Sequence, residues 1–164
     1  MGNLYLLCGK VGSGKTTIAK FLSENYGVIH FSADDFMLKL FGEIEDRDLF
    51  NQKLNATKYL IYEICDKILD KNDVVLDFGF WTKQERNELI KRFPKHNVVL
   101  IYNRINDEEI LNRIAKRNSN LKENEYFMDE ATFRFLSSLF EEPDKTEKFI
   151  VFETNEKLAK DLKL

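Results

Sequence analysis

Short, continuous apolar runs alternate along this chain with longer segments in which apolar residues recur every three or four positions. The short runs are typical of strands buried on both faces of a sheet, and the longer segments are typical of amphipathic helices. The pattern predicts strands at residues 4–8, 28–31, 74–76, 97–102 and 149–152. It predicts helices at residues 17–22, 35–41, 48–71, 82–93, 107–117, 129–140 and 156–162.

This alternation of strands and helices predicts an α/β fold with a five-stranded parallel sheet and helices on both of its faces. The 164 residues suit one domain with one sizeable core, so residues 1–164 are expected to form a single domain. Sheets of this kind bind ligands at the carboxyl ends of their strands. The residues that directly follow each strand are therefore the first candidates for a functional site.

One motif lies directly after the first expected strand. Residues 9–16 fit the spacing G-x-x-x-x-G-K-[ST] of a P-loop, and a helical pattern follows them. The glycines let the backbone approach an anion, and the loop N–H groups and the following helix N-terminus attract phosphate. The sequence therefore predicts a three-layer P-loop NTPase fold that binds ATP or GTP. The expected nucleotide-binding residues are Gly9, Gly12, Ser13, Gly14, Lys15, Thr16 and Thr17.

Lys15 and Thr16 of this loop each have a specific expected role, and Asp77 is expected to share the role of Thr16. Lys15 brings a positive charge to the terminal phosphates, and the Thr16 hydroxyl can ligate Mg²⁺. Asp77 ends the apolar run 74–76, as the metal-binding acid of a P-loop protein does. Asp77 could instead cap the next helix. We expect Thr16 and Asp77 to hold Mg²⁺ together.

Two neighbouring carboxylates, Asp34 and Asp35, follow the second expected strand. A hydroxyl group that attacks a γ-phosphate needs a carboxylate to orient it and to accept its proton. Helix capping is the alternative role for this pair, and Ser32 or Asp34 could cap helix 35–41. The strand-end position favours Asp34 as the general base, while the choice between Asp34 and Asp35 stays open.

Arg113 and Arg117 lie four residues apart on one expected helix, so they share a face. The polar segment 118–125 follows them, and we expect a lid at about residues 113–128 that brings both guanidinium groups to the transferred phosphate. A solvated basic helix end is the alternative. The aromatic residues Phe80 and Trp81, at the end of the third strand, could either contact an acceptor or belong to the core.

The composition of the chain limits the kinds of partner that we expect it to bind. The chain is 43% hydrophobic and 32% charged, which is typical of a soluble globular protein. Its net charge of −3 argues against a general affinity for nucleic acid. It contains no apolar run near the roughly 18 residues of a membrane span, and the strand at residues 4–8 leaves no room for a signal peptide. We therefore expect a cytoplasmic protein without a membrane partner.

Taken in order, the P-loop, the pair Asp34–Asp35, the run that ends in Asp77 and the two lid arginines resemble the small P-loop kinases over roughly residues 3–140. Within them the chain is most similar to the polynucleotide-kinase and zeta-toxin-like group, and more distantly to chloramphenicol phosphotransferase and gluconate kinase. The resemblance implies that Asp34 is the general base and that Arg117 and Arg113 stabilise the transferred phosphoryl group. It also matches Asp77 and Arg86 to the family's strand-end acid and a following arginine.

One position departs from the polynucleotide kinases, which carry an arginine three residues after the base to hold the acceptor strand. Met37 occupies that position here. The sequence therefore predicts an ATP- and Mg²⁺-dependent phosphotransferase with a small-molecule hydroxyl acceptor. A 5′-hydroxyl polynucleotide kinase and a nucleotide-binding regulatory ATPase are the alternatives. The absence of an N-K-x-D guanine motif disfavours a GTPase, and neither the acceptor nor the oligomeric state follows from the sequence.

Overall fold

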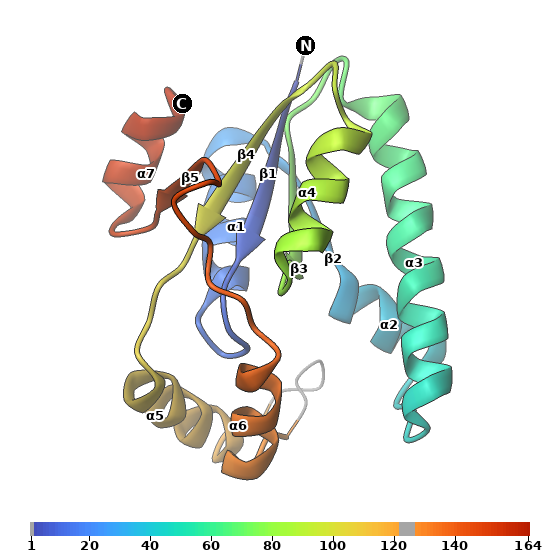
Figure 1. Ribbon diagram of the computed structural model, residues 1–164, viewed down its shortest axis with the longest axis vertical. Coiled ribbons are helices and arrows are strands. Elements are labelled where there is room, and N and C mark those ends of the chain that lie inside the picture. The colour runs from blue at the N-terminus through green and yellow to red at the C-terminus, as the bar shows by residue number, and fades with distance from the viewer. Residues whose placement is uncertain (1, 122–126) are drawn as a thin grey trace.

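The computed structural model describes residues 2–121 and 127–164. Its five strands form one parallel sheet in the order β2-β3-β1-β4-β5, with helices on both faces (Figure 1). The predicted fold class is therefore confirmed. The strands are β1 (Asn3–Cys8), β2 (Ile29–Ser32), β3 (Val74–Gly79), β4 (Asn97–Tyr102) and β5 (Phe149–Val151). The helices are α1 (Lys15–Tyr26), α2 (Ala33–Phe41), α3 (Arg47–Ile68), α4 (Lys83–Arg92), α5 (Asp107–Asn118), α6 (Glu130–Ser138) and α7 (Asn155–Leu162).

The central strand β1 is buried on both faces, which explains its continuous apolar run. Its side chains alternate between two cores, because successive residues of a strand point to opposite sides of the sheet. Leu4 and Leu6 pack in the core that includes residues of α3 and α4. Tyr5 and Leu7 pack in the core that includes residues of α1 and α7. Strand β1 therefore packs against the helices on both faces of the sheet, and the P-loop follows directly after it.

A third, smaller core lies beyond the carboxyl ends of the strands, where α5 and α6 pack together (Figure 1). It consists of Ile110 and Ile114 from α5, Met128, and Phe133 from α6, with Val11 of the P-loop packed against it. Helices α5 and α6 thus form a separate wall at the edge of the sheet where ligands are expected. In the part of the chain that the structure describes, no helix is long and apolar enough to cross a membrane.

Three boundaries differ from the sequence prediction in ways that affect the site. Helix α1 starts at Lys15, two residues earlier than expected, with Gly14 as its N-cap. Helix α2 starts at Ala33 because the Ser32 hydroxyl accepts the N–H of Asp35 at 3.2 Å. Strand β3 continues three residues beyond the predicted apolar triplet, so Asp77 lies within the strand rather than after it.

Candidate nucleotide-binding and phosphotransfer site

The P-loop connects β1 to α1 at the centre of the sheet, as the motif predicted. Its glycines Gly9, Gly12 and Gly14 all have positive φ angles, of 152°, 76° and 99°. At Gly12 a side chain would also meet Ile110 and Ile114 of α5 at 3.0 and 3.1 Å. Glycine is therefore needed at Gly12 both for the backbone conformation and for the contact with the wall formed by α5.

The Lys15 side chain lies across the loop that precedes it. Its Nζ donates hydrogen bonds to the carbonyl oxygens of Gly9 and Lys10, at 3.0 and 2.8 Å. Burial lowers the pKa of Lys15, and the negative charges of Asp77 and Asp34 oppose this effect. The ammonium group is thus fixed beside the loop and within electrostatic reach of Asp34, the predicted general base, and of Asp77, the predicted metal ligand.

The hydroxyl of Thr16 donates a hydrogen bond of 2.6 Å to the Asp77 carboxylate, which joins the first turn of α1 to β3. Burial opposes ionisation of Asp77, but the neighbouring His30, the hydrogen bond from Thr16 and the charge of Lys15 outweigh it and lower the pKa of Asp77. His30 Nε2 lies 3.8 Å from Asp77, beyond hydrogen-bond distance. An ionised carboxylate next to a hydroxyl is an oxygen donor set that suits Mg²⁺, which binds proteins through one or two such groups together with substrate phosphates.

No cluster of three or more His, Cys, Asp or Glu side chains able to hold a metal occurs among residues 2–121 and 127–164. Mg²⁺ seldom uses an all-protein cage, so a magnesium site does not require such a cluster. Thr17 is exposed in the first turn of α1, and its N–H donates to the Gly14 carbonyl at 3.1 Å.

The carbonyl of Ser13 is a second fixed point of the loop. It accepts hydrogen bonds from Asn103 Nδ2 at 2.7 Å and from Arg113 Nη1 at 3.1 Å. Asn103 is only 4% exposed and follows β4 directly, and its N–H donates to the Cys8 carbonyl at 2.9 Å. The sequence analysis missed Asn103, although the rule that ligand sites form after strands would have selected it.

The two predicted lid arginines lie on α5, on the side of the P-loop. Arg113 contacts the loop through Ser13, and its Nε donates to Glu109 at 2.8 Å within the helix. Arg117 is half-buried one turn further on. The Asn118 side chain pairs with both backbone groups of Met128, at 2.6 and 3.3 Å. Residues 122–126 of the predicted lid lie outside the described residues.

The structure separates the two neighbouring carboxylates of α2. Asp35 forms an exposed i,i+4 ion pair of 3.1 Å with Lys39, and its N–H is the group that Ser32 caps. Asp34 is exposed in the first turn of α2. Partial desolvation in its surroundings and the nearby charge of Asp77 raise the pKa of Asp34, while the positive charges of Lys15 and Lys58 oppose the rise. Asp34 therefore shares an electrostatic environment with the P-loop lysine, as expected of a strand-end carboxylate.

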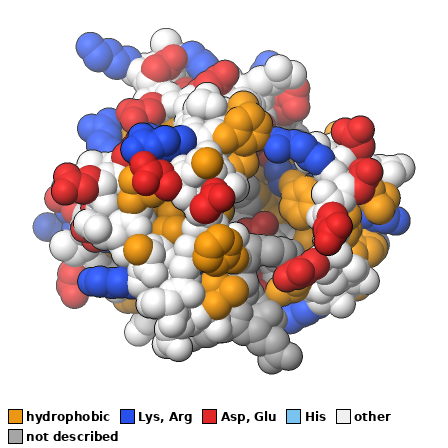
Figure 2. Space-filling view, turned by 90° about the horizontal axis from the view of Figure 1, so that it is seen from below, with side chains coloured by type: hydrophobic (Ala, Val, Ile, Leu, Met, Phe, Trp, Pro, Cys, Tyr) orange, Lys and Arg blue, Asp and Glu red, His pale blue; other side chains and the backbone are white. Residues whose placement is uncertain are grey.

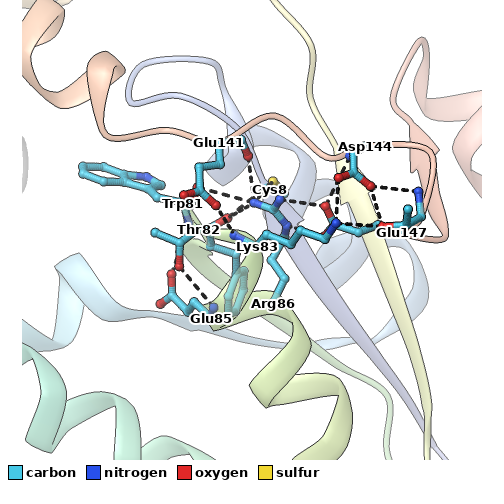
Figure 3. Close-up of polar contacts among 11 residues, drawn as sticks. Cys8, Trp81, Thr82, Lys83, Glu85, Arg86, Glu141, Asp144 and Glu147 are labelled. Carbon is cyan, nitrogen blue, oxygen red and sulfur yellow. Dashed lines mark hydrogen bonds and ion pairs between the residues drawn. The ribbon is translucent and has the colours of Figure 1, made fainter.

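A buried ion pair supports the turn that follows β3 (Figure 3). Arg86 of α4 is completely buried and binds Glu147 through two hydrogen bonds, of 2.7 and 2.9 Å. Its Nη1 donates to the carbonyls of Phe80 at 3.0 Å, Trp81 at 3.4 Å and Glu141 at 2.9 Å. One guanidinium group thus joins the β3–α4 turn to the segment that leads into β5. The resemblance matched Arg86 to an arginine of the family, but Glu147 was not predicted as its partner.

A P-loop at the centre of a five-stranded parallel sheet, with carboxylates near the carboxyl ends of two neighbouring strands, defines the nucleotide-binding fold of the P-loop kinases. Comparison with known proteins agrees: residues 4–143 match a family described as an AAA domain, and the chain belongs to this family. Over 121 residues it is 31% identical to an adenylate kinase of Mesomycoplasma hyopneumoniae. This match covers 68% of the chain and 57% of the relative, so the chain spans little more than half the length of that protein.

Solved structures share the whole fold. A putative kinase from Chloroflexus aurantiacus aligns with a TM-score of 0.76 at 15% identity, over 99% of this chain and 94% of its own. A sugar kinase from Janibacter sp. aligns with a TM-score of 0.66 at 19% identity, over 99% of this chain and 92% of its own. The predicted relationship to the small P-loop kinases is thereby confirmed.

Proposed function

We propose that this protein is a kinase that transfers the γ-phosphate of ATP to a hydroxyl group of a small molecule and requires Mg²⁺. In this reaction a bond forms between the acceptor oxygen and the γ-phosphorus, and the bond from that phosphorus to the bridging oxygen of ADP breaks. The acceptor proton passes to a carboxylate. We further propose that residues 1–164 act as one kinase domain with a lid at about residues 113–128.

The observation that carries this proposal is the meeting of three strand ends. Lys15 after β1, Asp34 after β2 and Asp77 in β3 act on one another electrostatically. Figure 2 views this end of the molecule and shows a central hollow with acidic atoms inside it, between the side of α2 and α3 and the side of α5 and α6. A donor phosphate and a carboxylate base would therefore face the same space.

Each side chain has a proposed role in that space. Lys15 and the loop N–H groups, with Gly9, Gly12, Ser13, Gly14 and Thr17 shaping the loop, hold the β- and γ-phosphates. Thr16 and Asp77 would hold Mg²⁺, which neutralises charge on the phosphates when it is bound. Asp34 orients the acceptor hydroxyl and takes its proton, and its raised pKa improves the match to that task.

Arg113 and Arg117 are proposed to stabilise charge on the transferred phosphoryl group. Arg113 is already close to the P-loop, since its Nη1 lies 3.1 Å from the Ser13 carbonyl. A guanidinium group in this position can add a hydrogen bond to phosphate oxygens without a large movement of the helix. Arg117 shares its face of α5 because the two residues are one turn apart.

A small-molecule acceptor is favoured over a polynucleotide by the surroundings of Met37. Its side chain is only 1% exposed and packs against α3, where its sulfur accepts a hydrogen bond from Thr57 at 3.6 Å. A buried methionine cannot bind the phosphates of a nucleic-acid strand. An oligonucleotide-binding assay at low salt tests this point, because binding through phosphates would be strongest there.

Nucleotide binding is tested by a thermal-shift titration with ATP and Mg²⁺. Binding to the folded state raises the melting temperature of the wild-type protein, and Lys15→Ala should abolish the increase. A full increase in Lys15→Ala would refute the assigned role of the P-loop. GTP serves as the comparison nucleotide, and a regulatory ATPase would hydrolyse ATP slowly without any acceptor.

The base assignment is tested by measuring phosphate transfer to a panel of hydroxyl compounds. Asp34→Asn should reduce kcat by at least about a hundredfold, since general-base catalysis is typically worth that much or more. Asp35→Asn is the matched control, because the Asp35 carboxylate forms an ion pair with Lys39. Equal losses in the two variants would contradict the choice of Asp34.

A further inference from the structure

The main chain of Trp81 is anchored on both sides. Its backbone N–H donates to a Glu85 carboxylate oxygen at 3.1 Å, and its backbone carbonyl accepts the N–H of Glu141 at 2.8 Å. The indole lies against Gly79, where a side chain would come within 2.5 Å of Nε1. Figure 3 shows the ring pointing away from the Arg86 network. The residue is half-buried, so part of its surface stays accessible beside Gly79.

The turn that carries this ring is part of the proposed phosphotransfer site. Gly79 is two residues beyond Asp77 on β3, and its carbonyl accepts the N–H of Gly9 in the P-loop at 3.3 Å. Asp77 pairs in register with Ser32 on the neighbouring strand β2, two residues before Asp34. The turn that carries the indole therefore follows β3, the strand next to β2, after which the proposed base lies.

An ion pair ties the same turn to α3. Glu85 binds Lys58 at 2.6 Å through one carboxylate oxygen and the Trp81 N–H through the other. Lys58 is only 16% exposed at its side chain, and its charge also acts on Asp34. The charges of Lys58 and Glu85 are paired with each other. We therefore consider the aromatic ring, rather than these charges, as the group of this turn that could contact a ligand.

The elements on either side of the hollow add more apolar surface. On α2, Asp34, Leu38 and Phe41 are spaced four and three residues apart, so they share one flank of the helix. On α6, Phe135 is 48% exposed and lies under the guanidinium of Arg47 from α3, 4.9 Å from its ring centre. Figure 2 shows hydrophobic side chains around the hollow. A polyol would need several hydrogen-bonding side chains here, whereas a flat apolar group fits these surroundings.

We propose that Trp81 is a specificity-determining platform and that the acceptor is a hydroxyl compound with an aromatic ring, which stacks on the indole while its hydroxyl meets Asp34. This inference rests on the proposed kinase function and identifies the class of its acceptor. Aromatic rings stack favourably on tryptophan through their faces, with no requirement for a particular hydrogen-bond pattern.

Matched pairs of probes test the acceptor class. Uridine is compared with methyl β-D-ribofuranoside, which has the same sugar hydroxyls but no base, and benzyl alcohol is compared with cyclohexylmethanol. Within each pair the aromatic member should be phosphorylated with at least a tenfold higher kcat/KM. Equal or better use of the non-aromatic members would overturn the proposal.

Binding gives a second measurement that does not depend on phosphate transfer. Trp81 is the single tryptophan of the chain, so its fluorescence reports contacts at this position without labelling. Uridine and benzyl alcohol should quench it saturably, and their non-aromatic counterparts should not. Quenching without phosphorylation would retain the platform and refute the kinase proposal, whereas absence of quenching by both aromatic probes refutes the platform.

Two substitutions separate stacking from simple filling of space. Trp81→Phe keeps a flat ring and should change the KM of the aromatic acceptor less than threefold, whereas Trp81→Leu should raise it at least tenfold. Both variants should keep the wild-type KM for ATP. Tyr59→Leu is the control, because Tyr59 is an aromatic residue on a different element, α3, and is 64% exposed. If Trp81→Leu and Trp81→Phe gave equal KM values, the ring would have no role as a platform.

Discussion

Removing the Glu147 carboxylate should strongly destabilise the protein, because it leaves the charge of Arg86 buried without a counter-ion. The Arg86 side chain is 0% exposed and that of Glu147 is 3% exposed, so water cannot replace the missing partner. In Glu147→Leu the guanidinium loses two hydrogen bonds, of 2.7 and 2.9 Å. The bonds from Nη1 to three backbone carbonyls and to the Cys8 sulfur remain.

The expected loss follows from the behaviour of buried ion pairs. Removing one partner typically lowers the free energy of unfolding by about 3–5 kcal/mol, a large share of the roughly 5–15 kcal/mol that stabilises a typical protein. For a chain of this length each 1 kcal/mol lowers Tm by about 2–4 °C, so Tm should fall by about 6–20 °C. Urea denaturation at pH 7 measures the free energy directly.

The difference in free energy of unfolding between wild type and Glu147→Leu should also depend on pH. Hydrogen bonds from Arg86 keep the pKa of Glu147 below its usual value, so the pair stabilises the fold most fully above the unfolded-state pKa of about 4.3. That stabilisation is lost as the pH falls through the lower pKa of the folded state. The stabilities of wild type and Glu147→Leu should therefore differ fully at pH 7 and converge in acid.

A double variant and a surface control make this reasoning refutable. Arg86→Met combined with Glu147→Leu removes both charges and should recover part of the loss, although the Glu141 carbonyl then loses its bond from Arg86. Glu130→Leu breaks an exposed ion pair with Arg134 and should have little effect. A Glu147→Leu variant no less stable than the surface control would show that the buried pair does not behave as described.

Three further predictions concern the site. Desolvation and the nearby charge of Asp77 raise the pKa of Asp34, so kcat/KM should fall with decreasing pH through a value above the usual 3.9 or so of an aspartate, and a pH–rate profile measures this limb. Gly79→Ala should cost about 2 kcal/mol or more, because φ is 86° and a Cβ would meet the indole, and urea denaturation would show it. Asn103→Ala should weaken ATP binding, measured by calorimetry, because the Ser13 carbonyl loses its 2.7 Å bond; unchanged affinity would show that this bond does not order the loop.

The parts of this fold that could be predicted from sequence are those determined by local pattern. The apolar run of β1, the glycine spacing of the P-loop and the capping residues Ser32 and Thr82 are all short-range signals. The approach of Asp34 and Asp77 was also predictable, because parallel strands present their carboxyl ends at one edge. These signals suffice for the donor side of the proposed site.

Contacts between distant segments could not be predicted in this way. Glu147 is 61 residues from Arg86, and nothing in its local sequence distinguishes it from the glutamates that are exposed. Asn103 reaches Ser13 across 90 residues. The apolar run predicted a strand that stops at residue 76, before Asp77, yet β3 continues to Gly79. Pairing with β1, rather than the length of the apolar run, sets the end of this strand.

The central place of β1 also has a consequence for how the chain folds as it is synthesised. Leu4 pairs with Val74 of β3 and with Val98 of β4, so the strand made first gains its two neighbours only after most of the chain has emerged. Until then this apolar segment has no sheet to join, and such segments are prone to associate with other chains. Closing two long loops around β1 also slows folding relative to a protein of local contacts. Competence to bind nucleotide should therefore appear late in folding, when β4 docks and Asn103 reaches the P-loop.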